Sequence, residues 1–366
     1  MPEYDIAIVG GGLAGCAAAI TTLQSSPRAR ILVLERGSYP RNKVCGEFIS
    51  PEGMAALSRL LGAAETSLLA GHAPAITHAN IRVDGRILSA PIRPPAASIT
   101  RFDLDVALWR QATKLGADCR EKSPVLRVEK KAAFELQLDG EQVNATALVN
   151  AAGRWSIFTQ AVVTKTNGRH ERWIGLKCHF AESAASGTID LYLFNGGYCG
   201  VQPVAADRVN ACAMVRPEAA STVAEVCALH PELRERSRSW TPLTEPVTTA
   251  PLYFRDPIPV ENGIFNAGDA VGFIDPFVGD GMTLALHSGI LAGEALARYT
   301  SGDCDLRAAA NIYGHEYQTR LVPAFRRARW VRKMIYLPSV IRVPLGRLIQ
   351  MTGVTETLLR ATRIAG

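Results

Sequence analysis

The sequence lacks the patterns that are typical of membrane-spanning, secreted and metal-binding proteins. It contains no apolar run of about 18 residues, the length that a membrane-spanning helix requires. Its 8 cysteines form no C-x-x-C pair and no metal-type spacing. The first expected strand begins at Tyr4, which leaves no room for a signal peptide. We therefore expect a cytoplasmic protein with reduced cysteines and no bound metal ion.

Acidic residues are almost missing from the end of the chain. Residues 319–366 contain ten Arg and Lys residues and one acid, Glu356, whereas the preceding residues are close to neutral. Basic patches are not paired with aromatic platforms, so nucleic-acid binding is not expected. Two interpretations remain for the basic segment: peripheral contact with an anionic membrane surface, or the basic face of helices that cap the rest of the protein.

The first clear pattern is a strand, a glycine turn, a helix and a second strand over residues 4–35. Gly10, Gly12 and Gly15 have the G-x-G-x-x-G spacing, and the second apolar run ends at Glu35. In this pattern the glycines allow a tight turn, close approach of the backbone to a pyrophosphate, and close packing of the helix on the strand. The acid can accept hydrogen bonds from a ribose. The pattern predicts a dinucleotide site without a 2′-phosphate.

The loop at residues 36–50 is rich in Pro, Gly, Ser and Asn, which excludes regular structure over most of it. A loop that leaves the end of the second strand lies near the ligand crevice of an open α/β sheet. Arg41, Lys43, Cys45 and Glu47 are therefore candidates for the site. The alternative is a solvated charged loop.

The middle of the chain alternates between helical and strand patterns. Short strands are expected at 81–83 and 87–89, and an amphipathic helix follows Thr100, a plausible N-cap. Arg101 begins that helix, where a cation opposes the helix dipole, so we expect it to meet an anion. Four alternating runs within 173–215 predict an inserted antiparallel sheet of about four strands.

Three motifs stand in one order: the glycine pattern with Glu35, AGRWS at 152–156, and NAGDA at 266–270 followed by PFVGDG. This order resembles the FAD-dependent oxidoreductases of the para-hydroxybenzoate hydroxylase fold, which include flavin monooxygenases, geranylgeranyl reductases and flavin-dependent halogenases. The resemblance implies an α/β protein with a Rossmann-like FAD-binding domain of the GR2 type and an inserted antiparallel-sheet substrate domain. It places the FAD-binding domain at 1–75, 99–170 and 255–318, the substrate domain at 76–98 and 171–254, and a basic helical segment at 319–366.

The resemblance also implies which residues bind FAD. Asp269 is similar to the acid that holds the ribityl chain, and the helix start at Gly279, Gly281 and Met282 is expected to point at the flavin ring. Arg101 matches an arginine that touches the cofactor. The full cofactor-binding prediction comprises Gly10, Gly12, Leu13, Ala14, Gly15, Glu35, Arg36, Lys43, Cys45, Arg101, Asp269, Gly279, Gly281 and Met282.

Departures from the family patterns distinguish the branches. Aromatic hydroxylases usually have Asp-Gly where this chain has Ala152 and Gly153, and a His after the GDA motif where it has Val271 and Gly272. Halogenases look similar over 40–47, but their W-x-W-x-I-P signature is missing. The segments KVCGE at 43–47 and GDGM at 279–282 look most like the geranylgeranyl reductase branch, in which a loop cysteine equivalent to Cys45 lies near the flavin.

We therefore expect an FAD-dependent reductase or dehydrogenase of an apolar prenyl- or polyketide-like molecule. The alternatives are an NAD(P)H-dependent flavin monooxygenase and a non-enzymatic role with FAD as a structural ligand. NAD(P)H or another reductant would supply electrons. Cys45 is the candidate proton donor, or else a small packing residue. The substrate is expected under the inserted sheet, lined by Phe48, Tyr192, Phe194, Tyr198 and Gln202.

Overall fold

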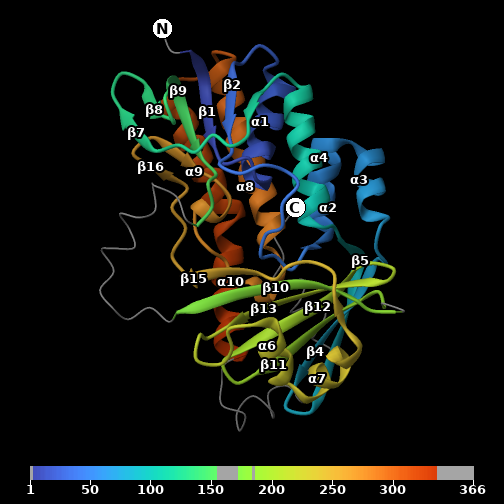
Figure 1. Ribbon diagram of the computed structural model, residues 1–366. Coiled ribbons are helices and arrows are strands. Elements are labelled where there is room, and N and C mark those ends of the chain that lie inside the picture. The colour runs from blue at the N-terminus through green and yellow to red at the C-terminus, as the bar shows by residue number, and fades with distance from the viewer. Residues whose placement is uncertain (1–2, 155–171, 184–185, 336–366) are drawn as a thin grey trace.

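Two β-sheets, one above the other in Figure 1, organise the protein. The computed structural model describes residues 3–154, 172–183 and 186–335. The upper sheet has eight strands, and β16-β17-β9-β1-β2-β6 is its main order. Five of these strands run parallel, as the two apolar runs that flank the glycine turn predict. The strands are β1 (Tyr4–Val9), β2 (Ile31–Leu34), β6 (Asp118–Arg120), β7 (Arg127–Lys130), β8 (Phe134–Gln137), β9 (Gln142–Asn150), β16 (Val260–Glu261) and β17 (Ile264–Asn266).

Helices cover the upper sheet and enclose the larger apolar core. Helix α1 (Leu13–Ser25) lies directly against α8 (Gly281–Thr300), because Gly289 lets the two backbones approach closely. A Cβ atom at Gly289 would be 2.2 Å from the backbone oxygen of Ala14, so no other residue fits there. The other long helices are α2 (Pro51–Leu61), α3 (Ala63–Ala70), α4 (Arg101–Lys114), α9 (Leu306–Arg320) and α10 (Val322–Ile335).

The predicted start of α4 is confirmed, because the side chain of Thr100 accepts a hydrogen bond from the backbone N–H of Asp103. Helix α3 was not predicted. It has almost no amphipathic pattern, since only Thr66 and Leu69 are buried in it. Its position is therefore set by packing against α2 rather than by its own periodicity.

The lower sheet contains the four expected strands and continues beyond them. Its order is β14-β10-β13-β12-β11-β4-β5-β3, with β15 also paired to β10. The sheet is not wholly antiparallel, because β11 pairs in parallel with β4. The β4–β5 hairpin covers the edge of β11 that would otherwise remain unpaired. The strands are β3 (Phe48–Ile49), β4 (Ile76–Val83), β5 (Arg86–Ser98), β10 (Trp173–Ala181), β11 (Thr188–Phe194), β12 (Gly197–Ala205), β13 (Arg208–Val215), β14 (Thr241–Pro242) and β15 (Val247–Leu252).

The two faces of the lower sheet have different neighbours. On β10, Leu176 and Cys178 pack with the short helices α6 (Val223–Ala228) and α7 (Pro231–Arg236). Side chains at the alternating positions, such as Lys177, point the other way, toward the upper sheet. The lower sheet therefore presents one face to the carboxyl ends of the upper strands.

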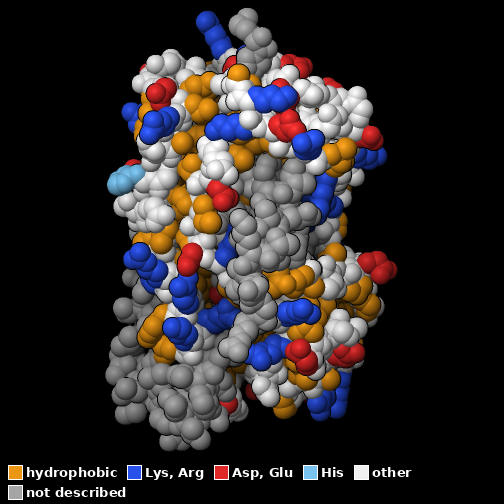
Figure 2. Space-filling view, turned by 90° about the vertical axis from the view of Figure 1, so that its left-hand side faces the viewer, with side chains coloured by type: hydrophobic (Ala, Val, Ile, Leu, Met, Phe, Trp, Pro, Cys, Tyr) orange, Lys and Arg blue, Asp and Glu red, His pale blue; other side chains and the backbone are white. Residues whose placement is uncertain are grey.

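Helix α10 carries a basic stripe on its exposed side. Arg326, Arg329, Trp330 and Lys333 are exposed and lie at helical spacing on one face. Figure 2 shows Lys and Arg side chains spread from top to bottom over the face that it presents, with Asp and Glu side chains among them. Among the described residues, every helix is too short or too polar to span a bilayer. Residues 336–366 of the predicted basic segment lie outside the described residues, and its contact with a membrane surface stays a prediction.

Candidate functional site

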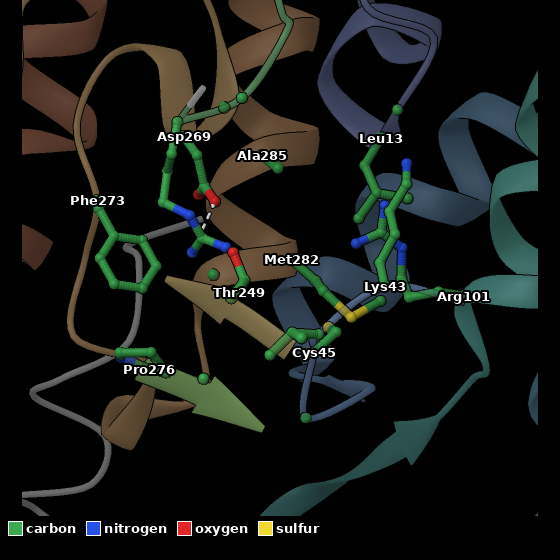
Figure 3. Close-up of a pocket in the computed structure, with 18 of the residues that line it drawn as sticks. Leu13, Lys43, Cys45, Arg101, Thr249, Asp269, Phe273, Pro276, Met282 and Ala285 are labelled. Atoms are coloured by element: carbon green, nitrogen blue, oxygen red, sulfur yellow. Dashed lines mark ion pairs between the residues drawn. The ribbon is translucent and has the colours of Figure 1, made fainter. Parts of the chain in front are cut away.

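A cavity of about 660 Å³ lies between the two sheets. Its wall combines the carboxyl ends of β1 and β9, the loop 41–48, the start of α8 and the inner face of the lower sheet. Figure 3 shows Lys43 and Arg101 on one side of this space, Asp269 and Phe273 on the other, and Cys45 between them. The crevice is thus at the position where open α/β sheets bind their ligands.

The three glycines of the first motif have different surroundings. Gly10 has a φ of +107°, and a Cβ atom there would lie 2.3 Å from the backbone oxygen of Ala151. A Cβ atom at Gly15 would lie 1.9 Å from the backbone oxygen of Gly10, so this glycine packs the helix on the strand and does not line the cavity. At Gly12, the nearest atom to a Cβ would be Lys43 Nζ at 3.5 Å. Gly12 therefore leaves open space at the N-terminus of α1, which fits a pyrophosphate.

Two cations and one buried acid surround this open space. Lys43 Nζ lies 2.9 Å from Asp105 Oδ2, and Arg101 Nη2 lies 2.8 Å from Asp105 Oδ1. Burial would raise the pKa of Asp105, but the charges of Arg101 and Lys43 bring that pKa below its ordinary value. Burial lowers the pKa of Lys43. Arg101 and Lys43 carry two positive charges, whereas Asp105 carries one negative charge. The three side chains together therefore keep a net positive charge that can bind an anion, the kind of group that the sequence analysis expected at Arg101.

Glu35 lies at the other end of the glycine turn and is held by the protein itself. Its two carboxylate oxygens accept hydrogen bonds from the backbone N–H groups of Gly11, at 3.1 Å, and Gly37, at 3.0 Å. Arg41 Nη2 lies 2.9 Å from Oε1. The carboxylate is 3% exposed and lines the cavity. Its remaining lone pairs can accept from ribose hydroxyls, so its geometry is compatible with the predicted contact.

The predicted cofactor residues at the far end also meet at the cavity. Asp269 lies in the short 3-10 turn η2 (Gly268–Ala270), and Arg154 Nη1 is 3.4 Å from its Oδ2. Gly279, Gly281 and Met282 line the same wall at the start of α8. All residues of the cofactor prediction except Gly15 therefore line one cavity, while their contacts with FAD stay predictions. Residues 155 and 156 of the second motif lie outside the described residues.

The substrate-lining prediction needs correction at two positions. Phe48, Tyr198 and Gln202 line the cavity, but Tyr192 and Phe194 lie on the opposite face of the sheet. Tyr192 packs against the ring of His230 at a centroid distance of 5.2 Å. Because successive side chains of a strand point to opposite faces, the cavity positions of β11 are Ile189 and Leu191 instead.

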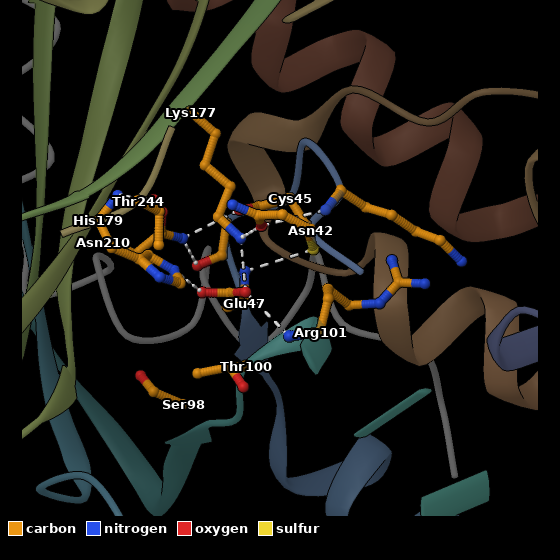
Figure 4. A network of polar contacts seen from close by, with 12 residues as sticks. Asn42, Cys45, Glu47, Ser98, Thr100, Arg101, Lys177, His179, Asn210 and Thr244 are labelled. Atoms are coloured by element: carbon orange, nitrogen blue, oxygen red, sulfur yellow. Dashed lines mark hydrogen bonds and ion pairs between the residues drawn. The ribbon is translucent and has the colours of Figure 1, made fainter. Parts of the chain in front are cut away.

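A buried polar cluster that the sequence analysis largely missed joins the loop to the lower sheet (Figure 4). Glu47 Oε1 accepts from Lys177 Nζ at 2.6 Å, and Oε2 lies 2.7 Å from His179 Nε2. The side chains of Glu47 and Lys177 are completely buried. Burial would raise the pKa of Glu47, but the hydrogen bond from His179 and the charge of Lys177 hold that pKa below its ordinary value.

The same cluster fixes the backbone around Cys45. Asn210 Nδ2 donates to the backbone oxygens of Cys45 and Gly46, each at 2.9 Å. The N–H of Glu47 donates to Cys45 Sγ at 3.3 Å. Cys45 lines the cavity, so its thiol is held between the cofactor wall and the substrate sheet. Glu47 was a sequence candidate, whereas Lys177 and Asn210 were not predicted. Their one signal in the sequence is a polar residue within an apolar strand.

A pH-dependent stability is expected from Asp275, which lies beside the cavity wall and is 5% exposed. Burial raises its pKa from 3.8 to about 6, against a hydrogen bond from Phe277 and the charge of Arg332. The pKa of Asp275 in the folded protein lies above its pKa in the unfolded chain, so the neutral carboxyl favours the folded state. This contribution to stability is complete below the unfolded pKa. It is lost as the pH rises through about 6.

We therefore expect Asp275→Asn to raise the free energy of unfolding by about 1–3 kcal/mol relative to the wild type at about pH 8, and by much less at about pH 4. Urea unfolding at both pH values measures the difference. The exposed Asp207→Asn is the control and should show no such pH dependence. An equal effect of Asp275→Asn at both pH values would contradict the raised pKa.

Comparisons with known proteins agree with this geometry. A family model described as an FAD binding domain matches residues 3–317. A menaquinone reductase of Mycobacterium tuberculosis is 25% identical over 92% of this chain and 85% of its own length. One of Mycolicibacterium smegmatis is 22% identical over 93% of this chain and 86% of its own length.

Solved structures of known flavoproteins share the fold. A geranylgeranyl bacteriochlorophyll reductase-like protein from Thermoplasma acidophilum superposes with a TM-score of 0.78 at 21% identity, over 98% of this chain and 95% of its own. A flavin-dependent brominase superposes with a TM-score of 0.77 at 21% identity, over 98% of this chain and 93% of its own. The expected fold class is confirmed by these neighbours and by the family match. The chain belongs to the FAD binding domain family and is an FAD-dependent oxidoreductase.

Proposed function

We propose that this enzyme is a reductase that adds two hydrogens across a carbon–carbon double bond of an apolar, prenyl-like small molecule. The observation that carries the proposal is the continuity of the cavity. One end is the glycine and cation cradle, and the other end lies against the apolar inner face of the lower sheet. A ligand in the second end would therefore lie directly beside a cofactor in the first.

The substrate end is built from apolar side chains of several elements. Leu191 from β11, Leu252 from β15 and Phe273 from the loop before α8 line it. Tyr198 and Phe277 meet there edge to face at a centroid distance of 5.2 Å. Such a lining favours a hydrocarbon chain and excludes water from the reacting groups. The names of the relatives, menaquinone reductase and geranylgeranyl bacteriochlorophyll reductase-like protein, support the same substrate class.

The residues of this chain would bind, orient and protonate. Gly12, Lys43 and Arg101 would hold the phosphates of FAD, and Asp269 its ribityl chain. Bound FAD supplies hydride transfer chemistry. The cluster around Glu47 would keep the Cys45 thiol at the cavity, where its S–H can give a proton to the second carbon of the double bond.

Substitution of Cys45 tests this last role. We expect Cys45→Ala, assayed at saturating FAD, to lower kcat by about a hundredfold or more, because a positioned acid typically contributes about a hundredfold to ten-thousandfold. Cys45→Ser keeps a transferable proton and should retain more activity than the alanine variant. The neighbouring cavity thiol variant Cys212→Ala is the control and should leave kcat unchanged. Equal activity of Cys45→Ala and wild type would exclude the thiol as proton donor.

The reaction class is tested by incubating the FAD-loaded enzyme with NAD(P)H and a polyprenyl substrate, with and without O₂. The proposal predicts a product that has gained two hydrogens in both conditions, without substrate-dependent O₂ consumption. A product that has gained one oxygen atom, formed only with O₂, would overturn it in favour of the monooxygenase alternative. Halogenation is not proposed, because the W-x-W-x-I-P signature is missing from the sequence.

A further inference from the structure

Helix α10 packs on the loop that lines the substrate end of the cavity. It contacts the short 3-10 turn η3 (Pro276–Val278), which contributes to the cavity wall. The guanidinium of Arg332 on α10 lies 3.8 Å from the centroid of the Phe254 ring, and its Nε is 3.6 Å from Asp275 Oδ2. Since these contacts fix how the helix is rotated, its opposite face points to solvent.

The solvent face of α10 is the basic stripe, which consists of the exposed residues Arg326, Arg329, Trp330 and Lys333. Among the described residues, Arg329 is the one cation of the stripe that is paired with an acid, Asp256. Helix α10 itself contains no Asp or Glu, so the stripe keeps a net positive charge. The side chain of Trp330 is 52% exposed, although burial of an indole ring is favourable.

An exposed indole ring among cations fits the surface of a lipid bilayer. Trp is enriched at membrane–water interfaces, because its ring is apolar and its N–H is polar. Each Lys or Arg near an anionic leaflet adds to the attraction, and the apolar stems of these side chains can lie against the acyl chains. A stripe of charge alone would suit any acidic surface, whereas Trp330 favours a surface with an apolar interior.

We propose that the basic stripe of α10 docks the enzyme peripherally on an anionic lipid bilayer. Docking needs neither substrate nor turnover, so it goes beyond the proposed reaction. The stripe is separated from the wall of the substrate end by one helix, a thickness of about 10 Å. An apolar ligand that is dissolved in the bilayer therefore has a short path to the cavity.

Vesicle binding of the full-length, purified protein tests the proposal. Sedimentation with vesicles of phosphatidylcholine alone, and of phosphatidylcholine mixed with phosphatidylglycerol, compares a neutral with an anionic surface. The wild type is expected to bind the anionic vesicles about tenfold or more tightly than the neutral ones, and high salt should reduce the difference. Equal binding to both surfaces, or binding to neither, would overturn the proposal in favour of an acidic protein as the occupant of the stripe.

Charge reversal assigns the contact to the stripe. The double variant Arg326→Glu with Lys333→Glu should bind the anionic vesicles about tenfold or more weakly than the wild type. The control Arg28→Glu with Arg110→Glu reverses the same number of exposed charges outside α10 and should weaken binding by less than about threefold. Equal losses in the two double variants would overturn the assignment to α10.

Lysine labelling of the wild type gives the same assignment if a variant does not fold. Anionic vesicles should slow the acylation of Lys333 by an amine-reactive reagent several-fold, whereas the exposed Lys114 on α4 should react as fast as it does without vesicles. Unchanged labelling of Lys333 would contradict the proposal. Since none of these measurements uses a substrate, a failure of docking remains distinguishable from a failure of the proposed reaction.

Discussion

Lys177→Met is expected to lower the free energy of unfolding by about 3–5 kcal/mol, because it leaves a buried carboxylate without its cation. Lys177 Nζ and Glu47 Oε1 are 2.6 Å apart, and both side chains are completely buried. The folded-state pKa of Glu47 lies below its ordinary value, so its contribution to stability is present above the unfolded pKa and is lost as the pH falls. Removing Lys177 also removes one cause of that low pKa. Urea unfolding at neutral pH measures the loss.

Two further variants distinguish the effect of breaking the buried ion pair from the effect of removing any charged side chain. Arg238→Met breaks an exposed pair with Glu235, whose side chains are 70% and 67% exposed, and should change stability by less than about 1 kcal/mol. The double variant Lys177→Met with Glu47→Gln should be more stable than the sum of the two single losses predicts, since the partners are coupled. A loss below about 1 kcal/mol in Lys177→Met would show that the cluster does not hold the loop.

Gly12→Val is expected to weaken FAD binding by about a hundredfold or more without unfolding the protein, because the side chain would occupy the open space at the start of α1. The backbone of Gly12 has φ −75° and ψ −169°, an extended conformation that valine adopts readily. Apart from the residues next to Gly12 in the chain, the described part of the structure brings only Lys43 Nζ and Arg101 Nη2 within 4 Å of the new Cβ position, so the fold has room for it. Titration of FAD into apo-protein measures Kd, and thermal unfolding of apo-protein checks the fold.

Gly200→Ala provides the matched control for the cavity. Gly200 lines the substrate end, where a Cβ atom would meet the flexible side chain of Leu191 at 3.3 Å. This variant should keep the wild-type affinity for FAD and weaken the binding of polyprenyl ligands. If Gly12→Val bound FAD as tightly as the wild type, the phosphates could not lie at Gly12.

The cofactor end could be predicted because its signals are local in the sequence. The spacing of Gly10, Gly12 and Gly15 forces one turn geometry, and the two apolar runs beside it require neighbouring parallel strands. Asp269 likewise follows a short apolar strand, β17, that the pattern had located. The structure brings these separate motifs to one cavity because the strands that carry them all run parallel in the upper sheet.

The substrate end could not be predicted in the same way, because it depends on contacts between distant segments. Tyr192 and Leu191 are adjacent in an almost wholly apolar strand, so alternation alone does not show which of them faces the cavity. Lys177, on a strand of the lower sheet, finds its partner Glu47 130 residues away, in the loop before β3. The parallel pairing of β11 with β4 is a similar long-range contact and left no local signal.

The visible absorption spectrum of the purified wild-type protein, before and after anaerobic addition of NADH or NADPH, is the most direct test of FAD binding in the cavity. The geometry around Gly12, Glu35 and Asp269 predicts the absorption of oxidised flavin, from the start or after incubation with FAD. A suitable donor should bleach it. A protein that shows no flavin absorption even after incubation with excess FAD would contradict the assignment of the cavity.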